Sequence, residues 1–175
     1  YNDAMEHDSC GVGLVASTDG TKSRKVVEYG IQALKAVWHR GAIDADGKTG
    51  DGAGIHIEIP SNFFIEKIEN YGRKYDGGII CTGMIFLPRN DYNAQEKCKT
   101  FIETELLKNG FNIYRWRQVP INSNVLGEKA EITRPEITQV LFTINNKSID
   151  EKILERKIYE TRRRIEKESV KNNLN

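Results

Sequence analysis

A near-continuous apolar stretch, Ile79–Leu87, most constrains what this chain can fold into. Gly77 and Gly78 precede it and Pro88 ends it, as is typical of strand boundaries. Its residues do not alternate with polar ones, and a strand of this kind is expected to be covered on both faces. The sequence therefore predicts a sheet inside a layered domain.

Further strands and helices follow one another along the chain. Apolar patterning predicts strands at Cys10–Ser17, Gly54–Ile59, Phe111–Val119 and Gln139–Ile144. Capping residues and helical spacing predict helices from Ser23 to about Trp38, from Ser61, from Asn90 or Asp91 to Lys108, and from Ser148 or Asp150. The first two strands are expected to pair around the first helix, and residues 120–135 form a long connection with little periodicity. This pattern predicts an α/β or α+β layered domain.

Composition excludes several functional classes. The chain has 175 residues, 38% of them hydrophobic and 29% charged, with a net charge of +1. This balance is typical of a globular domain and gives no electrostatic reason to expect a nucleic-acid or membrane partner. No apolar run approaches the roughly 20 residues that span a bilayer, and the acidic first ten residues do not resemble a secretory signal. The basic run Arg162–Arg164 is interleaved with glutamates, which favours an ion-paired, solvated helix face.

The cysteines and histidines predict neither a disulfide framework nor a metal site. Cys10, Cys81 and Cys98 form no CxxC pair, and their number is odd, so a reducing cytoplasm is the expected compartment. His7 and His56 have no ligand partners at metal-binding spacing, so no metal is assigned.

The run that begins at Cys10 carries the strongest functional signal. A thiol stands before Gly11 and Gly13, whose small size allows close approach of backbone or substrate. If residues 1–9 are removed, Cys10 gains a free α-amine with a pKa of about 7.7–8.0, close to that of an ideal general base at neutral pH. While Ser9 remains attached, that nitrogen is an amide and cannot take a proton. The alternative interpretation of Cys10 is an ordinary buried thiol without a catalytic role.

Three ordered motifs resemble the glutamate synthase family. They are Glu6–Gly13 at the Cys10 junction, His39–Ala42 after the first predicted helix, and Thr49–Ile55 in the following loop. Weaker similarity continues through residues 116–120, 126–127 and 134–137 and covers nearly the whole chain. Each motif alone is weak evidence, but the ordered set is specific.

The resemblance implies a class-II glutamine amidotransferase domain. Its fold would be α+β, the four-layer αββα sandwich of N-terminal-nucleophile hydrolases, incomplete here at its C-terminal side. Residues 1–9 would be a propeptide, residues 10–168 the N-terminal part of the domain, and residues 169–175 a frayed tail. Cys10 would attack the glutamine side-chain amide, and water would then release glutamate from the thioester. The ammonia would serve to make glutamate from 2-oxoglutarate in other domains, where FMN and an iron–sulfur cluster are expected.

The resemblance also implies that residues 1–175 alone are inactive. The family's segment that binds the glutamine carboxylate and its Asn-Gly oxyanion hole have no counterpart here; Asn124 and Gly127 are not adjacent and are rejected as a substitute. Losing one oxyanion donor typically costs about 10²–10³ in turnover. The expected partners are therefore glutamine and the remaining glutamate synthase domains or a complementing polypeptide. The alternative function is a non-catalytic remnant or partner-binding piece of a split or decayed gene.

Three further residues are candidates for the site. The resemblance places Arg40 beside the nucleophile, whereas its position alone fits a cation at a helix end. Asp51 is either an orienting carboxylate or an Asx-turn residue, and Gly52 allows a tight turn next to the site. His39 is interpreted as structural, and a Cys10–His39 hydrolase is the competing mechanism.

Overall fold

The structure is a computed structural model that describes residues 11–144, 146, 148–172 and 174. The chain divides into two compact units. The first consists of Tyr1–Glu58 with Asn122–Ile132, and the second of Ile59–Ile121 with Thr133–Asn175. Each unit has its own packing and is described separately.

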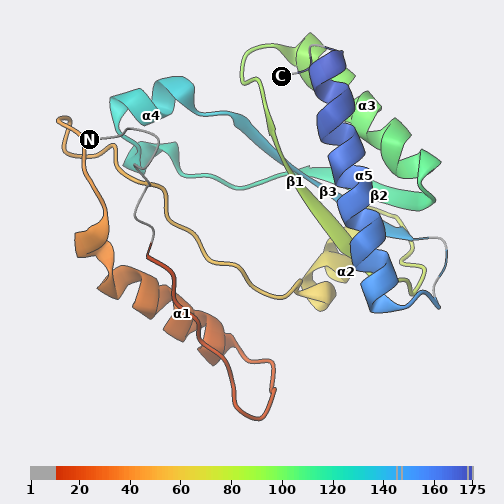
Figure 1. The fold of residues 1–175 in the computed structure, drawn as a ribbon, viewed down its shortest axis with the longest axis horizontal. Helices are drawn as coiled ribbons and strands as arrows, with labels where there is room; N and C mark the ends of the chain where they lie inside the picture. Colours follow the sequence, from red (N-terminus) through yellow and green to blue (C-terminus); the bar gives the residue numbers. More distant parts are fainter. Residues whose placement is uncertain (1–10, 145, 147, 173, 175) are drawn as a thin grey trace, which may run out of the picture. The chain divides into compact units, whose positions relative to one another are not determined.

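The second unit is built on a three-stranded antiparallel sheet (Figure 1). Its strands are β1 (Cys81–Leu87), β2 (Phe111–Gln118) and β3 (Glu136–Ile144), in the order β1-β3-β2. The central strand β3 is buried from Thr138 to Ile144 because it has a neighbour on each edge and packed residues on both faces. The three predicted strands of this region are confirmed, and the mixture of helices and sheet agrees with an α+β fold.

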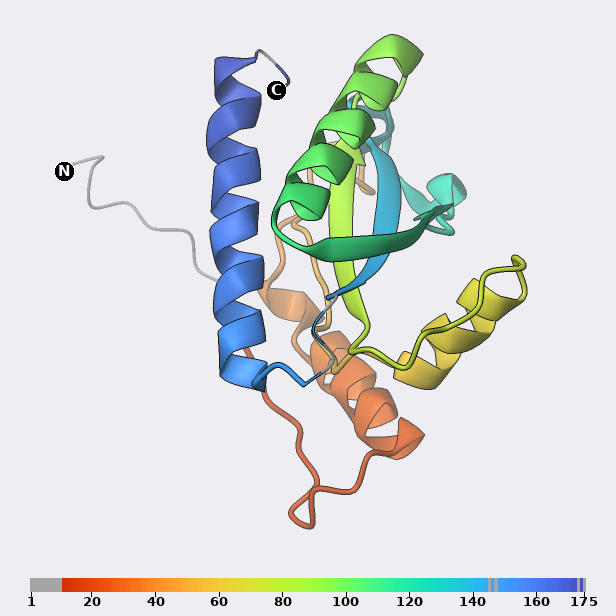
Figure 2. The same cartoon turned by 90° about the vertical axis from the view of Figure 1, so that its right-hand side faces the viewer.

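Two helices cover one face of the sheet. They are α3 (Tyr92–Lys108) and α5 (Glu151–Lys171), which pack against each other and lie side by side in Figure 2. The buried core beneath them consists of Cys81, Ile102, Leu106, Phe111, Val140, Phe142, Ile144 and Leu154. The aspartate preceding each helix caps it: Asp91 accepts a 2.9 Å hydrogen bond from Ala94 N, and Asp150 one of 2.9 Å from Lys152 N. Both predicted helix starts are therefore confirmed.

The other face of the sheet is covered only in part. The short helix α2 (Ser61–Glu69) contributes Phe64 and Ile68 to a cluster with Ile80, Tyr114 and Leu141.

Beyond that cluster, Met84 is 51% exposed and Phe86 65% exposed. The prediction that Ile79–Leu87 is covered on both faces is therefore wrong. The reason is that β1 is an edge strand, and α2 packs near its beginning only.

A bulge in β2 changes which side chains share a face. The pairing of β2 with β3 shifts register between Ile113 and Arg115, so Tyr114 has no partner of its own. Trp116 consequently packs with the α3/α5 core, on the same face as Phe111 and Ile113, and Tyr114 packs on the α2 face. A simple alternation along the strand would put Trp116 opposite Phe111, but one inserted residue reverses the alternation after it.

The first unit contains helices and turns. Its elements are α1 (Arg24–Ala36), the 3₁₀ turn η2 (Trp38–Arg40), the 3₁₀ turn η3 (Ser123–Val125) and α4 (Glu128–Thr133), whose last residue belongs to the second unit. Helix α1 begins after Ser23 as predicted. The short helix α4 lies within the connection for which no periodicity was predicted.

Two predicted strands of the first unit do not form. Residues 11–17 and 54–58, with Ile59 at the start of the other unit, adopt extended or irregular backbone without ladder pairing, and Cys10 lies outside the described residues. Val12 is 94% exposed and Leu14 91% exposed, so the expected burial is wrong as well. The physical reason is that a strand needs a neighbour to satisfy its backbone groups, and no described residue forms a ladder with these segments.

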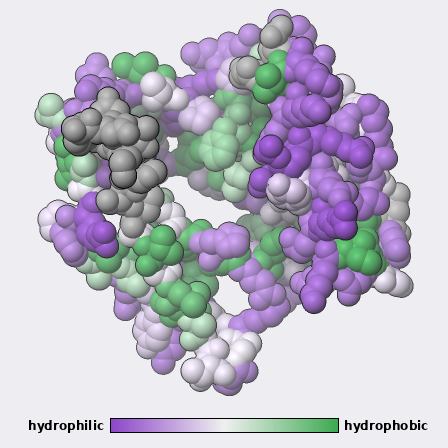
Figure 3. All heavy atoms as spheres, viewed as in Figure 1, coloured by the Kyte–Doolittle hydropathy of each residue, from purple (hydrophilic) through white to green (hydrophobic). Residues whose placement is uncertain are grey.

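Helix α5 has a strongly charged outer surface, and Figure 3 shows that side as mostly hydrophilic. Arg156 pairs with Glu160 at 2.8 Å, and Arg162 pairs with Glu166 at 3.2 Å, one turn apart. The ion-paired face predicted from the interleaved charges is thus present. The helix continues to Lys171, three residues into the predicted frayed tail. No helix among the described residues is long and apolar enough to cross a membrane.

Replacing Leu141 with alanine is expected to lower the free energy of unfolding by about 3 kcal/mol, because Leu→Ala at a packed site leaves a cavity. Leu141 is fully buried in the central strand. Met84→Ala in the neighbouring strand is the matched control, and its half-exposed side chain predicts a loss below about 1 kcal/mol. Urea unfolding of the full-length gene product measures both. Equal losses for the two variants would contradict the assigned core.

Candidate active site

A tight hairpin over residues 44–50 organises the first unit around the candidate residues. Asp44 N donates to Thr49 O at 2.7 Å, and Ile43 and Gly50 form an antiparallel bridge. At the turn, Asp46 accepts hydrogen bonds from Lys48 N at 2.9 Å, from Thr49 N at 2.7 Å and from Thr49 Oγ1 at 2.6 Å. These donors lower the pKa of Asp46 to about 2, so the turn keeps its charged acceptor at neutral pH.

The hairpin brings Asp51 against Ala42. Ala42 N donates to Asp51 Oδ2 at 2.8 Å, and Asp51 N donates to Ala42 O at 3.2 Å. The carboxylate therefore orders the backbone two residues after Arg40. The carboxylate of Asp51 thus bonds to backbone, and its role at the site stays a prediction.

Arg40 ends the 3₁₀ turn η2 and lies against the segment that follows Cys10. Its aliphatic Cδ is 3.9 Å from the position that a Cβ on Gly11 would occupy. Arg40 N donates to Val37 O at 3.0 Å, which anchors the turn. The structure thus places Arg40 next to Gly11, while Cys10 itself lies outside the described residues. His39 occupies the same turn and is exposed.

Glycine is required at Gly50, because an added Cβ would lie 2.8 Å from Ala42 O in the hairpin bridge. At Gly52, in contrast, no atom lies within 4 Å of such a Cβ, and its surroundings are open. Gly52 follows Asp51 directly, so its candidate role stays a prediction that depends on what approaches this open side.

The two described cysteines are poorly suited to be nucleophiles. Burial raises the pKa of the Cys81 thiol to about 11, and burial also raises the pKa of the half-buried Cys98. A thiolate is the reactive form, and a raised pKa disfavours it at neutral pH. Both cysteines lie in the second unit, on β1 and α3.

Metal ligands do not gather in the part of the chain that the structure describes. Among those residues, no group of three His, Cys, Asp or Glu side chains is arranged to hold an ion. Asp44 and Asp46 lie in one hairpin, but their carboxylates are engaged by Lys129 and by the turn residues.

Sequence reasoning missed the contribution of residues 122–132. Gly127 approaches the hairpin so closely that an added Cβ would lie 2.1 Å from Thr49 Oγ1, and Lys129 Nζ pairs with Asp44 Oδ2 at 2.7 Å. The glycine directly before the acidic start of a helix is the only local signal. Nothing local marks Lys129, because its partner is 85 residues away in the sequence.

Comparison with known proteins agrees with the motifs at the site. The sequence profile of the class-II glutamine amidotransferases matches residues 10–175. The matched region begins at Cys10. The chain therefore belongs to the class-II glutamine amidotransferase family.

Similar proteins include several glutamate synthases. The chain is 53% identical over 167 residues to the glutamate synthase [NADPH] large chain of Azospirillum brasilense. This match covers 95% of the present chain and 11% of that protein. It is 37% identical over 163 residues to the ferredoxin-dependent glutamate synthase of Pyropia yezoensis, and 37% identical over 163 residues to ferredoxin-dependent glutamate synthase 1 of Arabidopsis thaliana. Each of these two matches covers 93% of this chain and 10% of the relative. The chain thus spans about a tenth of the length of these relatives.

Proposed function

We propose that this chain is the nucleophile-bearing part of a glutaminase domain that hydrolyses glutamine to glutamate and ammonia. The observation that carries the proposal is the family match over residues 10–175, which starts at the one cysteine that the motifs select as nucleophile. The raised pKa values of Cys81 and Cys98 support the same choice.

The proposed chemistry begins after residues 1–9 are removed. The freed α-amine of Cys10 takes the proton of its own thiol, and the thiolate attacks the carboxamide carbon of glutamine. The tetrahedral intermediate collapses as the α-ammonium returns a proton to the leaving nitrogen, so the carbon–nitrogen bond breaks and ammonia departs. A water molecule, deprotonated by the same amine, then attacks the thioester. Glutamate leaves and the thiol is restored.

Arg40 and Asp51 have separate roles in this proposal. The guanidinium of Arg40 supplies a fixed positive charge and planar donors for the thiol's surroundings or for the substrate. The position of its Cδ, 3.9 Å from where a Cβ on Gly11 would lie, supports a place beside the nucleophile. Asp51 orders the backbone that carries Arg40 through Ala42. Gly52 is proposed to line the same site, which leaves room for substrate at its open side.

The four-layer αββα sandwich is the finer fold that we propose. The second unit supplies one helical layer, α3 with α5, and one sheet. The exposed apolar side chains of Met84 and Phe86 on the opposite sheet face support a second sheet stacked there.

The names of the relatives support a wider proposal. We propose that the ammonia is used to make glutamate from 2-oxoglutarate by other glutamate synthase domains or by a complementing polypeptide. FMN and an iron–sulfur cluster are proposed to reside there, and the compartment is proposed to be the cytoplasm. On this basis the 175 residues alone remain predicted to be inactive.

A direct assay tests the proposed reaction. The full-length gene product, isolated with residues 1–9 absent as judged by intact mass, is incubated with glutamine, and glutamate and ammonia are quantified. One glutamate and one ammonia per glutamine consumed are expected, with asparagine as the control substrate turned over far more slowly. If glutamine is left intact by this cleaved, full-length material, the proposal is wrong and the non-catalytic alternative gains.

A further inference from the structure

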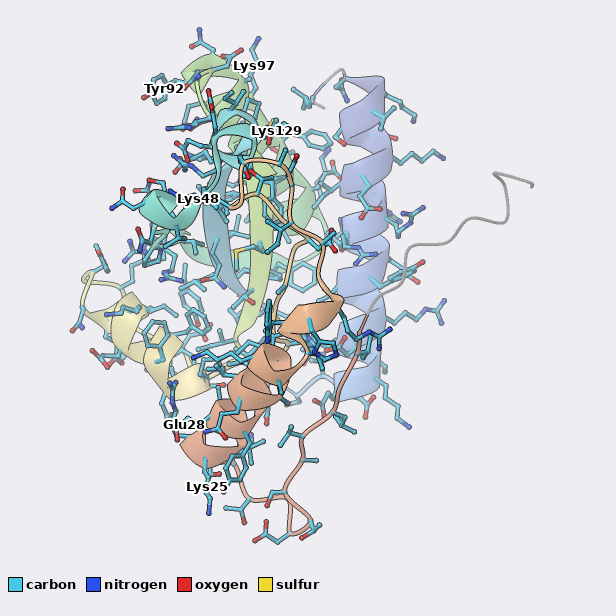
Figure 4. All side chains as sticks on the ribbon, turned by 90° about the vertical axis from the view of Figure 1, so that its left-hand side faces the viewer. Lys25, Glu28, Lys48, Tyr92, Lys97 and Lys129 are labelled. Atoms are coloured by element: carbon cyan, nitrogen blue, oxygen red, sulfur yellow. The ribbon has the colours of Figure 1, made fainter. Side chains whose placement is uncertain are left out.

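Residues 122–132 contact the 44–50 hairpin at two points. Lys129 Nζ lies 2.7 Å from Asp44 Oδ2, and the carboxylate of Asp44 is about one-third exposed. Gly127 lies against Thr49 so closely that a Cβ there would be 2.6 Å from the Thr49 backbone nitrogen. Figure 4 shows Lys129 close to the hairpin that carries Lys48.

Hydrogen bonds within residues 122–132 hold this segment in shape. Asn122 caps the 3₁₀ turn η3 by accepting from Asn124 N at 3.2 Å. Gly127 O accepts from Glu131 N at 3.0 Å, which starts α4 and aims Lys129 from its first turn. Gly127 and Lys129, two residues apart, therefore meet Thr49 and Asp44 on the two sides of one hairpin.

The hairpin in turn sets the position of the candidate site residues. Its two ends are joined by the Ala42–Asp51 hydrogen bonds and by the Ile43–Gly50 bridge. Ala42 is two residues from Arg40, whose Cδ lies 3.9 Å from the position that a Cβ on Gly11 would occupy. A shift of the hairpin would therefore move the backbone two residues from Arg40.

We infer that Gly127 and Lys129 are positioning residues of the glutaminase site, which hold the 44–50 hairpin in the register that orients Arg40. The inference rests on the proposed function. Neither residue is expected to touch glutamine. An ion pair as exposed as Lys129–Asp44 contributes little to global stability, so its effect is local, on the geometry of the hairpin.

Two variants of the full-length gene product test the inference. Gly127→Ala forces a methyl group into Thr49, and a misplacement of about 1 Å at a catalytic group can reduce rate by about 10²-fold. We expect kcat for glutamine to fall by about 10- to 100-fold in Gly127→Ala and by about 3- to 10-fold in Lys129→Met. Lys129→Arg, which keeps the charge and the donor, is expected to restore most of the loss. The urea unfolding midpoint is expected to stay unchanged in Lys129→Met.

The control and a second readout separate positioning from a general structural effect. Lys22 forms an exposed ion pair with Glu58 in the same unit, so Lys22→Met removes a comparable pair away from the hairpin. It is expected to leave kcat unchanged. Amide hydrogen exchange over residues 42–51 is expected to accelerate in Gly127→Ala and Lys129→Met, and to stay unchanged in Lys22→Met.

The outcomes test the positioning role of Gly127 and Lys129 separately from the proposed glutaminase function. A drop in kcat together with faster exchange over 42–51 supports the positioning role. Unchanged kcat, or a drop without faster exchange, overturns it. A Cys10→Ala protein that still hydrolyses glutamine would instead defeat the proposed function, and the exchange experiment remains readable in that case because it needs no activity.

Discussion

We expect the replacement of Cys10 with alanine to abolish glutamine hydrolysis. In the proposed mechanism this side chain supplies the electrons that form the thioester, and burial disfavours the thiolate form of the two described cysteines by raising the pKa values of Cys81 and Cys98. Loss of a catalytic nucleophile in hydrolases of this general kind costs up to about 10⁶-fold in kcat. We expect at least a 10⁴-fold loss, on the order of that precedent.

Cys98→Ala is the matched control for Cys10→Ala. It removes a thiol of the same kind from the outer part of α3, where the side chain is half-buried. It is expected to leave glutamine hydrolysis unchanged. Synthesis of glutamate from added ammonia is expected to survive in both variants, because only the generation of ammonia needs the thiol. Loss of the ammonia-dependent reaction in Cys10→Ala alone would show that the variant damages more than the nucleophile.

The second large effect is expected from the leader. With residues 1–9 attached, the nitrogen of Cys10 is an amide and cannot accept a proton. General base catalysis typically contributes about 10²–10⁴-fold. The uncut form is therefore expected to hydrolyse glutamine about 10²–10⁴-fold more slowly than the form that begins at Cys10.

The pH dependence distinguishes the amine from a histidine base. In the cleaved form, kcat/KM for glutamine is expected to rise with pH through the ordinary α-amine range of about 7.7–8.0, because the free base is the active form. A cleaved and an uncut sample of equal purity are compared by intact mass and by rate. Should the uncut protein match the cleaved one, the amine is not the base, and a His39 mechanism, tested with His39→Ala, takes its place.

Elements determined by local physics were predictable from the sequence. Helices α3 and α5 begin after Asp91 and Asp150, since an aspartate at this position caps the free amides of the first turn. The end of α3 was also predictable, because a glycine just after the last turn is typical of a helix end. In the structure Gly110 adopts a φ of 77°, which glycine allows. The strands that became β1, β2 and β3 combine apolar runs with nearby turn signals.

Features that depend on distant partners were not predictable. The segments at residues 11–17 and 54–59 have strand-like sequences, yet pairing is decided by what lies beside them. The bulge at Tyr114 leaves no mark on composition but reverses the faces of the residues that follow it. Local propensity carries no information about either effect.

The candidate site shows the same division. The motif around His39–Ala42 and the glycine-rich loop indicated Arg40 and Asp51, but only the structure reveals that Asp51 acts on Ala42 and that Arg40 lies against Gly11. The Lys129–Asp44 pair joins residues 85 positions apart, and an exposed lysine carries no signal of its partner.

Covalent trapping by an electrophilic glutamine analogue tests most directly whether Cys10, with a free α-amine, is the nucleophile. The full-length gene product is treated with the analogue, digested, and the modified peptide is sequenced by mass spectrometry, with excess glutamine as the competitor. We expect one adduct, on the sulfur of Cys10 in a peptide whose first residue is Cys10, and we expect glutamine to protect against it. An adduct on Cys81 or Cys98, or on Cys10 with residues 1–9 still attached, would contradict it.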